Sequence, residues 1–458
     1  MLSLKQRFGP WSFYKTALVI ALPVMVQQFI MSMVSLIDNF MVAGLGDVSM
    51  AAVNVTNHLL FVFIVIIGTF CQAGGIYIAQ YKGAGDEKGM KQAYRFKMLF
   101  TGAMAIMAII AGRAIPQPML AVMTMGNAAQ EEIVSLGSNY LKLITWTFIP
   151  MAVSYSIGTS FREISRPKIP LIISVIATLV NTAGNWILIY GNLGAPRLEI
   201  RGAAYATIIA RVIEALIFLI YAARVKAPFY VGLMRIFNIN KKLIREIFFK
   251  SGMIFASEMS WVISETVMVA MYNRRGGAEV VAGMAAGWTI ANIFFLIFGG
   301  IWTVTGILVG GSLGAGKLDE ARDRAQWLKT GSVVSSSIIV IPGVLMSVFL
   351  IPIVFFNLSD EARANCLGLV LVILAYLPLW SFLNTQFAIS RAGGDTALGM
   401  YTDLSVNSLL FIPGAFILSY MTTLAPVPMF AILKLTDIVK IFICRHLLRK
   451  ERWVKNLT

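Results

Sequence analysis

Long apolar stretches, separated by short polar segments, make up most of this chain of 458 residues. A helix needs roughly 20 apolar residues to cross the hydrocarbon core of a bilayer. Twelve stretches are about that long or longer, so the pattern predicts twelve transmembrane helices. Their approximate ranges are 16–43, 51–80, 96–121, 133–160, 168–190, 202–223, 249–272, 281–310, 329–356, 364–390, 397–420 and 426–444.

The second half of the chain repeats features of the first. Gly46 matches Gly277, and Gly75 matches Gly306 at the same spacing. Further along, Asn181 matches Asn407 at a slightly shorter spacing. Because each half holds an even number of predicted spans, both halves have the same orientation in the membrane. A duplication kept only for the stability of the fold would leave the same repeat, so the repeat alone identifies no function.

The repeat predicts an all-α polytopic membrane protein with twelve transmembrane helices in two six-helix lobes. We expect the N-terminal lobe at residues 1–224, a cytoplasmic linker at 225–248, and the C-terminal lobe with a basic cytoplasmic tail at 249–458. Two parallel repeats that meet around a cavity near the bilayer midplane are a common plan among secondary transporters.

Composition and charge agree with a protein that spans a membrane. Hydrophobic residues make up 58% of the chain and charged residues 13%, whereas soluble proteins carry about 25% charged residues. The formal net charge of +16 lies mainly in alternate loops and at the two ends of the chain. The positive-inside rule places these segments, and both termini, in the cytoplasm. We expect the lipid bilayer as a partner, and no nucleic acid.

The sequence favours transport over catalysis. The two histidines, His58 and His446, lie far apart, and the three cysteines show no metal-binding or disulfide spacing. No Gly-Lys-Ser/Thr phosphate loop is present. We therefore expect neither an enzyme nor a cofactor, and an ion gradient or an outside partner as the energy source. A channel would explain the repeat and a buried acid less well.

Asp38 is an acidic residue inside the first predicted span. A carboxylate at that depth is costly unless it faces a partner, a cavity or an ion, so a functional role is the default interpretation. The alternative is a structural role, in which Asp38 accepts hydrogen bonds from Asn181 or Asn185.

Several motifs, in order along the chain, resemble those of the multidrug and toxic compound extrusion (MATE) family of antiporters. They stand at 38–46 (DNFMVAGLG), 80–85 (QYKGAG), 202–207 (GAAYAT) and 391–396 (RAGGDT). The resemblance covers nearly the whole chain. It implies alternating access and export of amphipathic, often cationic compounds in exchange for protons or sodium. It also implies the inner membrane of a bacterium as the location, and we expect the protein to act as a monomer.

The resemblance further implies an ion-coupling site in the N-terminal lobe. Many bacterial relatives use an Asp in the first helix, an Asn and an Asp one turn apart in the fifth, and a Thr in the sixth. These positions map onto Asp38, Asn181, Asn185 and Thr207. This chain departs from that pattern at Asn185, where an amide replaces the second acid.

A second departure concerns the C-terminal lobe. Val262 and Trp380 stand where other members carry a Glu and an Asp. Glu258 and Glu265 lie four residues before and three after Val262, on the same helical face. With Trp261 beside them they form a candidate substrate cavity, because a carboxylate pair and an aromatic face both attract organic cations. A structural role for both acids is the alternative.

The chemistry of Asp38 allows two coupling ions. One carboxylate neutralises one sodium ion, and amide and hydroxyl oxygens complete its ligands. The same group can instead take a proton, because burial in apolar surroundings favours the neutral form of a carboxyl group. With Asn185 neutral, no second acid attracts a cation, which slightly favours proton coupling or a weaker sodium site.

Other charges inside the spans fit local ion pairs at a spacing of three residues. Arg211 with Glu214, and Lys434 with Asp437, are expected to pair in this way. Both pairs are interpreted as structural. The remaining functional alternative is a lipid-linked oligosaccharide flippase of the same superfamily, which is disfavoured because the candidate cavity residues are acidic or neutral.

Overall fold

The computed structural model describes residues 7–124 and 129–458, and the regular structure within these ranges is helical throughout. Ten of the described helices are long and apolar enough to cross a bilayer. Packing divides the chain into two compact units, which are described separately. The N-terminal unit comprises Val26–Lys82 and Asp86–Ser251, and the C-terminal unit comprises the chain up to Met25, Gly83–Gly85 and Gly252–Thr458.

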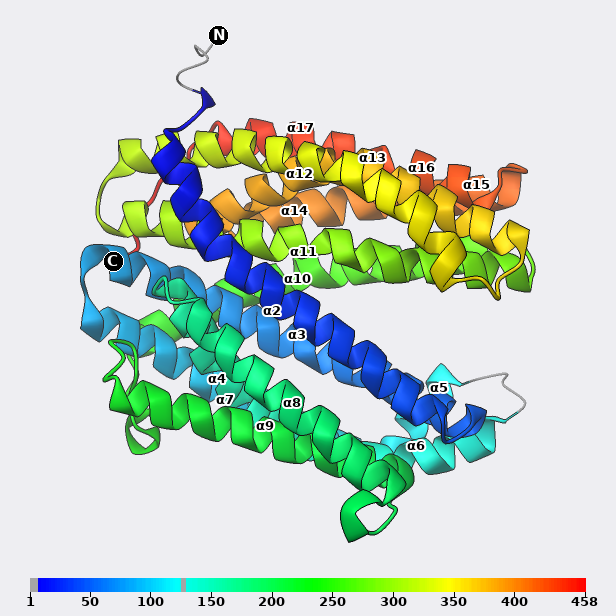
Figure 1. Cartoon of the computed structure of the whole chain (residues 1–458). Helices are drawn as coiled ribbons and strands as arrows, with labels where there is room; N and C mark the ends of the chain where they lie inside the picture. The colour runs from blue at the N-terminus through cyan, green and yellow to red at the C-terminus, as the bar shows by residue number, and fades with distance from the viewer. Residues whose placement is uncertain (1–6, 125–128) are drawn as a thin grey trace. The chain divides into compact units, whose positions relative to one another are not determined.

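The N-terminal unit contains the helices that surround the candidate site (Figure 1). Close packing of α8 against α9 depends on glycine: a Cβ atom on Gly202 would lie 2.4 Å from the backbone oxygen of Leu188. The helices of this unit are α2 (Trp11–Ala43, from residue 26), α3 (Asp47–Ala84), α4 (Glu87–Ala114), α5 (Pro116–Met123), α6 (Gln130–Ile144), α7 (Phe148–Glu163), α8 (Lys168–Tyr190), α9 (Glu199–Arg224) and the start of α10 (Lys241–Asn273).

The C-terminal unit is built around a long pair of helices, α11 and α13. Gly283 of α11 leaves room for the α13 backbone, since a Cβ atom there would lie 2.3 Å from the backbone oxygen of Ala362. Leu369, Ile373 and Trp380 of α13 contribute to the apolar core beside it. Besides the first part of α2, up to Met25, and the rest of α10, the helices are α11 (Ala278–Gly314), α12 (Leu318–Val354), α13 (Asp360–Ala392), α14 (Ala397–Val406), α15 (Ile412–Met421), α16 (Pro426–Lys434) and α17 (Thr436–Leu448).

Each predicted span corresponds to one helix or to consecutive helices, and proline explains two of the interruptions. The span expected at 133–160 changes to a short 3₁₀ segment, Thr145–Thr147, before α7. Pro150 lacks a backbone N–H, and its ring would clash with the carbonyl group four residues earlier in a continuous α-helix. Pro413 likewise follows the π-helical segment Asn407–Phe411 between α14 and α15.

The helices also begin earlier than the apolar pattern predicts. We expected the third span to start at residue 96, but α4 starts at Glu87. The helix of the seventh predicted span, α10, starts at Lys241 rather than near residue 249. It therefore reaches into the predicted linker at 225–248. Both extensions are polar, so hydropathy marks only the part of each helix suited to the hydrocarbon core.

The internal repeat is visible in how two corresponding helices end. Gly85 after α3 and Gly316 after α11 both have left-handed backbone conformations, with φ of 72° and 74°. In both turns the residue after this glycine donates its N–H to a carbonyl five residues earlier, as in Asp86 to Tyr81 and Lys317 to Ser312, each at 2.9 Å. This is the Schellman type of helix end, which favours glycine.

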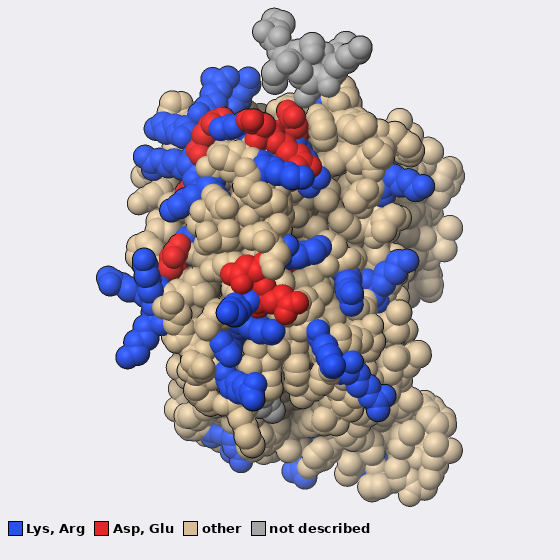
Figure 2. Space-filling view, turned by 90° about the vertical axis from the view of Figure 1, so that its left-hand side faces the viewer, with Lys and Arg blue, Asp and Glu red and all other residues tan. Residues whose placement is uncertain are grey.

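Basic side chains gather at one end of the helices. Figure 2 looks onto the face that lies on the left in Figure 1, and Lys and Arg are more abundant there than Asp and Glu. This face includes the turn between α3 and α4 (Figure 1). The distribution supports the cytoplasmic placement of these loops, which stays a prediction.

Candidate functional site

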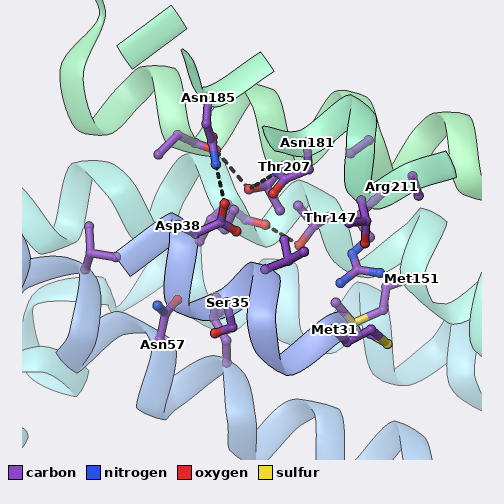
Figure 3. Close-up of a pocket in the computed structure, with 18 of the residues that line it drawn as sticks. Met31, Ser35, Asp38, Asn57, Thr147, Met151, Asn181, Asn185, Thr207 and Arg211 are labelled. Atoms are coloured by element: carbon purple, nitrogen blue, oxygen red, sulfur yellow. Dashed lines mark hydrogen bonds between the residues drawn. The ribbon is translucent and has the colours of Figure 1, made fainter. Parts of the chain in front are cut away.

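A cavity of about 360 Å³ lies inside the N-terminal unit and contains all four residues of the expected ion-coupling site. Figure 3 shows Asp38 on α2 directed toward Asn181 and Asn185 on α8 and Thr207 on α9. The remaining wall is largely apolar and includes the flexible or aromatic side chains Met31, Phe61, Phe148 and Met151.

Asp38 is held by neutral donors. Asn185 donates from Nδ2 to Asp38 Oδ1 at 2.7 Å (Figure 3). Among the residues that the structure describes, no Lys or Arg forms an ion pair with Asp38, although Arg211 lines the same cavity. A partly buried carboxylate with amide partners only keeps an uncompensated negative charge, which a cation or a proton can neutralise.

The side-chain amide of Asn181 lies between Asp38 and Thr207, and its oxygen and nitrogen can be assigned in two ways. In one, its nitrogen donates to Thr207 Oγ1 at 3.2 Å and its oxygen faces the carboxyl group. With the amide turned over, the nitrogen donates to both Asp38 oxygens, at 2.9 Å and 3.2 Å, and the oxygen accepts from Thr207. The second orientation satisfies both atoms of the amide, and it suits an ionised Asp38, which is only an acceptor.

Helix geometry explains why these side chains meet. Asn181 and Asn185 are one turn apart on α8, so both face the same neighbour. Small residues let α9 approach α8: a Cβ atom on Gly184 would lie 3.0 Å from the Cβ of Ala206. The neighbouring Thr207 thereby comes within hydrogen-bond distance of Asn181.

One atom of the site remains available as a ligand. Asn185 Oδ1 is buried and accepts no hydrogen bond from the described residues. With the two Asp38 oxygens, the Asn181 oxygen and Thr207 Oγ1, it forms a set of oxygen donors of the kind that an alkali cation needs. The site therefore fits a sodium ion by ligand type, and the carboxyl group of Asp38 can take a proton instead.

The expected pair of Arg211 and Glu214 is present at the edge of this cavity. Their closest atoms, Arg211 NH1 and Glu214 Oε2, are 2.9 Å apart. Ser174 donates to the other oxygen of Glu214 at 3.1 Å. Both oxygens of Glu214 are thus occupied, so the pair adds no open negative charge beside Asp38.

In the C-terminal unit, each of the two predicted cavity acids has a basic partner. Glu258 pairs with Arg391 NH1 at 2.9 Å, and Glu265 pairs with Lys434. Trp261 is 48% exposed and forms none of the described cation–π contacts. The two acids therefore do not present an open carboxylate pair, and a role for Glu258, Trp261 and Glu265 in a substrate cavity stays a prediction.

The predicted pairing of Lys434 with Asp437 is wrong. Lys434 contacts Glu265, while Asp437 lies 3.4 Å from Lys440 Nζ and accepts from Trp380 Nε1 at 2.8 Å. The reason is that other helices supply the partners: Glu265 of α10 reaches Lys434, and Trp380 of α13 shares Asp437 with Lys440.

The N-terminal unit also contains a buried ion pair that the sequence did not predict. Lys97 of α4 is fully buried, and its Nζ lies 3.0 Å from Glu163 Oε2 and 3.0 Å from Ser160 Oγ. A Cβ atom on Gly75 of α3 would lie 2.0 Å from Glu163 Oε1. The adjacent glycines Gly74 and Gly75 are the sequence feature that could have indicated this ion pair, because only glycine leaves room for it.

Comparison with known proteins gives matches along most of the chain. The model of the family described as MatE matches twice, at residues 23–187 and 253–417. The "Uncharacterized transporter YisQ" of Bacillus subtilis is 26% identical, with 83% of this chain and 82% of YisQ covered. The "Probable multidrug resistance protein YoeA" of the same species is 23% identical, with 90% and 88% covered.

The fold also matches solved structures. A crystal structure of a MATE protein in complex with MaL6 superposes with a TM-score of 0.84, covering 99% of this chain and 98% of that chain at 16% identity. Together with the two family matches, this confirms the predicted all-α membrane fold of twelve transmembrane helices in two six-helix lobes related by an internal repeat.

Proposed function

This chain belongs to the multidrug and toxic compound extrusion family, and we propose that it exports amphipathic, mainly cationic organic compounds in exchange for protons or sodium ions. Membrane transport and multidrug efflux follow from the family. We propose the exchange ion, the positive charge of the substrate and an alternating-access cycle in addition. We further propose a bacterial inner membrane as the location and a monomer as the active form.

The observation that carries the proposal is Asp38 within the cavity of the N-terminal unit. Its carboxyl group has amide partners and no Lys or Arg partner among the described residues, while the cavity wall around it is largely apolar. A cationic substrate and a coupling ion both gain from this negative charge. If they compete for it, release of one accompanies binding of the other, which is the requirement for exchange.

The flexible side chains of the cavity support a broad substrate range. Methionine fills irregular gaps and adapts its shape, and Met31 and Met151 share the cavity wall with the aromatic residues Phe61 and Phe148. A volume of about 360 Å³ is in the range of pockets that take drug-sized molecules. A flippase for lipid-linked oligosaccharides is not favoured, because Arg211, the basic residue in this wall, is already paired with Glu214.

The proposal is tested with purified protein in liposomes that contain a fluorescent organic cation. A proton gradient and a sodium gradient are imposed separately on the wild type and on Asp38→Asn. We expect one gradient to drive dye movement, and the variant to lose at least about 90% of that movement, because its amide cannot take up the coupling charge.

Glu132→Gln is the matched control, since Glu132 is an exposed acid outside the cavity, and it should transport like the wild type. Gradient-driven movement that persists unchanged in Asp38→Asn would contradict the role of Asp38. Dye that stays in place under both gradients in the wild type would contradict export of organic cations.

A further inference from the structure

The C-terminal unit contains a buried charge cluster that the proposed exchange at Asp38 does not use. It consists of Asp403 on α14 with Asp437 and Lys440 on α17, each no more than 7% exposed. Lys440 Nζ lies 3.2 Å from Asp403 Oδ1 and 3.4 Å from Asp437 Oδ1. One ammonium group therefore bridges two carboxylates.

Neutral donors complete the hydrogen bonds of both carboxylates. Ser257 donates to Asp403 Oδ2 at 2.5 Å, and Trp380 donates to Asp437 Oδ2 at 2.8 Å. Each carboxylate thus gives one oxygen to Lys440 and the other to a fixed donor. This arrangement pre-organises two anionic oxygens around a single positive charge, as in a site for a small cation.

Comparison of the two halves relates this cluster to the N-terminal site. In the register that matches Asn181 with Asn407, Arg211 corresponds to Asp437 and Glu214 to Lys440. Both halves therefore carry an ion pair three residues apart at the same place in the repeat, with the charges reversed. In the N-terminal half the basic member, Arg211, pairs with Glu214 and forms no ion pair with Asp38, whereas in the C-terminal half the basic member, Lys440, lies between two acids.

We propose that Lys440 is a tethered cation that occupies the position of an inorganic cation in the C-terminal unit. It keeps this half from binding a coupling ion and confines ion exchange to Asp38. The inference rests on the proposed function, because a tethered cation affects coupling only in an ion-exchanging transporter. Removal of the ammonium group should uncover a cation site made by Asp403, Asp437 and Ser257.

The test measures binding without transport, so its outcome is independent of the exchange assay. Asp38→Asn removes the N-terminal site, and Lys440→Gln is added to it. Unfolding of the detergent-solubilised proteins is followed in NaCl, KCl and choline chloride at equal ionic strength. Asp38→Asn alone should show the same Tm in all three salts. The double variant should gain about 2–4 °C in NaCl or KCl relative to choline, since a ligand that binds only the folded state raises Tm.

Two further variants keep the test decisive if Lys440→Gln weakens the fold. Lys440→Arg preserves the positive charge and should show no cation-specific shift. Asp403→Asn combined with Lys440→Gln removes both charges of one contact, and in the Asp38→Asn background it should fold but lose the shift. The proposal is overturned if Asp38→Asn alone has a cation-specific shift, or if the folded Lys440→Gln double variant has none.

Discussion

At the scale of single residues, Asn185 sets the charge of the candidate ion site. Its Nδ2 donates to Asp38 at 2.7 Å, so an acid at this position would place two carboxyl groups in contact. Two carboxylates this close cannot both stay ionised without a cation or a proton between them. Asn185→Asp should therefore bind sodium more tightly, by about one to two orders of magnitude, since one added charge at about 4 Å is worth up to about 4 kcal/mol at an effective dielectric of 20.

Binding of radioactive sodium to the purified protein measures this change. Asn192→Asp makes the same substitution just beyond the end of α8, where Asn192 donates to the backbone oxygen of Trp186 outside the cavity, and its sodium affinity should equal that of the wild type. An Asn185→Asp protein with unchanged sodium affinity would show that Asp38 is not part of a sodium site.

The buried pair of Lys97 and Glu163 makes a prediction about stability. Lys97→Met leaves Glu163 without its partner and should cost about 3–5 kcal/mol in the free energy of unfolding. Adding Glu163→Gln removes the uncompensated charge and should recover most of that loss. Thermal unfolding in detergent measures both variants.

An exposed pair on the same helix provides the comparison. Lys91 and Glu87 are 3.3 Å apart with side chains 36% and 62% exposed, so Lys91→Met should cost less than about 1 kcal/mol. Equal losses for Lys97→Met and Lys91→Met would contradict the importance of burial.

At the scale of helices, the contact between α8 and α9 determines whether Asn181 and Thr207 meet. A Cβ atom on Gly202 would lie 2.4 Å from the backbone oxygen of Leu188, and a backbone atom cannot move away as a side chain can. Gly202→Ala should therefore push the helices apart, cost about 1–3 kcal/mol in the free energy of unfolding, and reduce ion-driven transport.

Gly102→Ala on α4 is the control for the intrinsic effect of alanine. A Cβ atom there meets nothing within 4 Å, so the substitution should be neutral or stabilise the helix by up to about 1 kcal/mol. If Gly202→Ala has the same unfolding temperature and transport rate as Gly102→Ala, the close approach of α8 and α9 does not matter for the site.

The positions and contacts of the helices also show how much of the structure could be predicted from the sequence. Apolar length located the spans, and motif order placed Asp38, Asn181, Asn185 and Thr207, which the structure brings together in one cavity. The local spacing suggested Asp437 as the partner of Lys434, whereas the observed partner, Glu265, lies on another helix. The partners of Glu258 and Glu265 lie 133 and 169 residues away, and no local pattern reports such contacts.

At the scale of the whole molecule, the sidedness of the chain in the membrane remains to be measured. We predict that a cysteine at Arg235, in the segment between α9 and α10, or at Thr458 reacts with a membrane-impermeant maleimide only from the cytoplasmic side. A cysteine at Arg197, in the loop between α8 and α9, should react only from outside. The reason is that basic residues concentrate in the first set of segments and are retained inside during insertion.

The native cysteines should not contribute to this labelling. Cys71, Cys366 and Cys444 are all buried and form no disulfide, so labelling of intact cells before and after permeabilisation should report the introduced residue. The substituted positions are exposed, so poor access within the fold would not mimic the wrong side. Labelling of Arg197→Cys from the cytoplasm would reverse the orientation and would place the loops rich in Lys and Arg outside, against the charge bias on which the topology rests. With the orientation measured, the direction of transport relative to the ion gradient in oriented vesicles distinguishes export from uptake, because only export moves substrate away from the side that carries the termini.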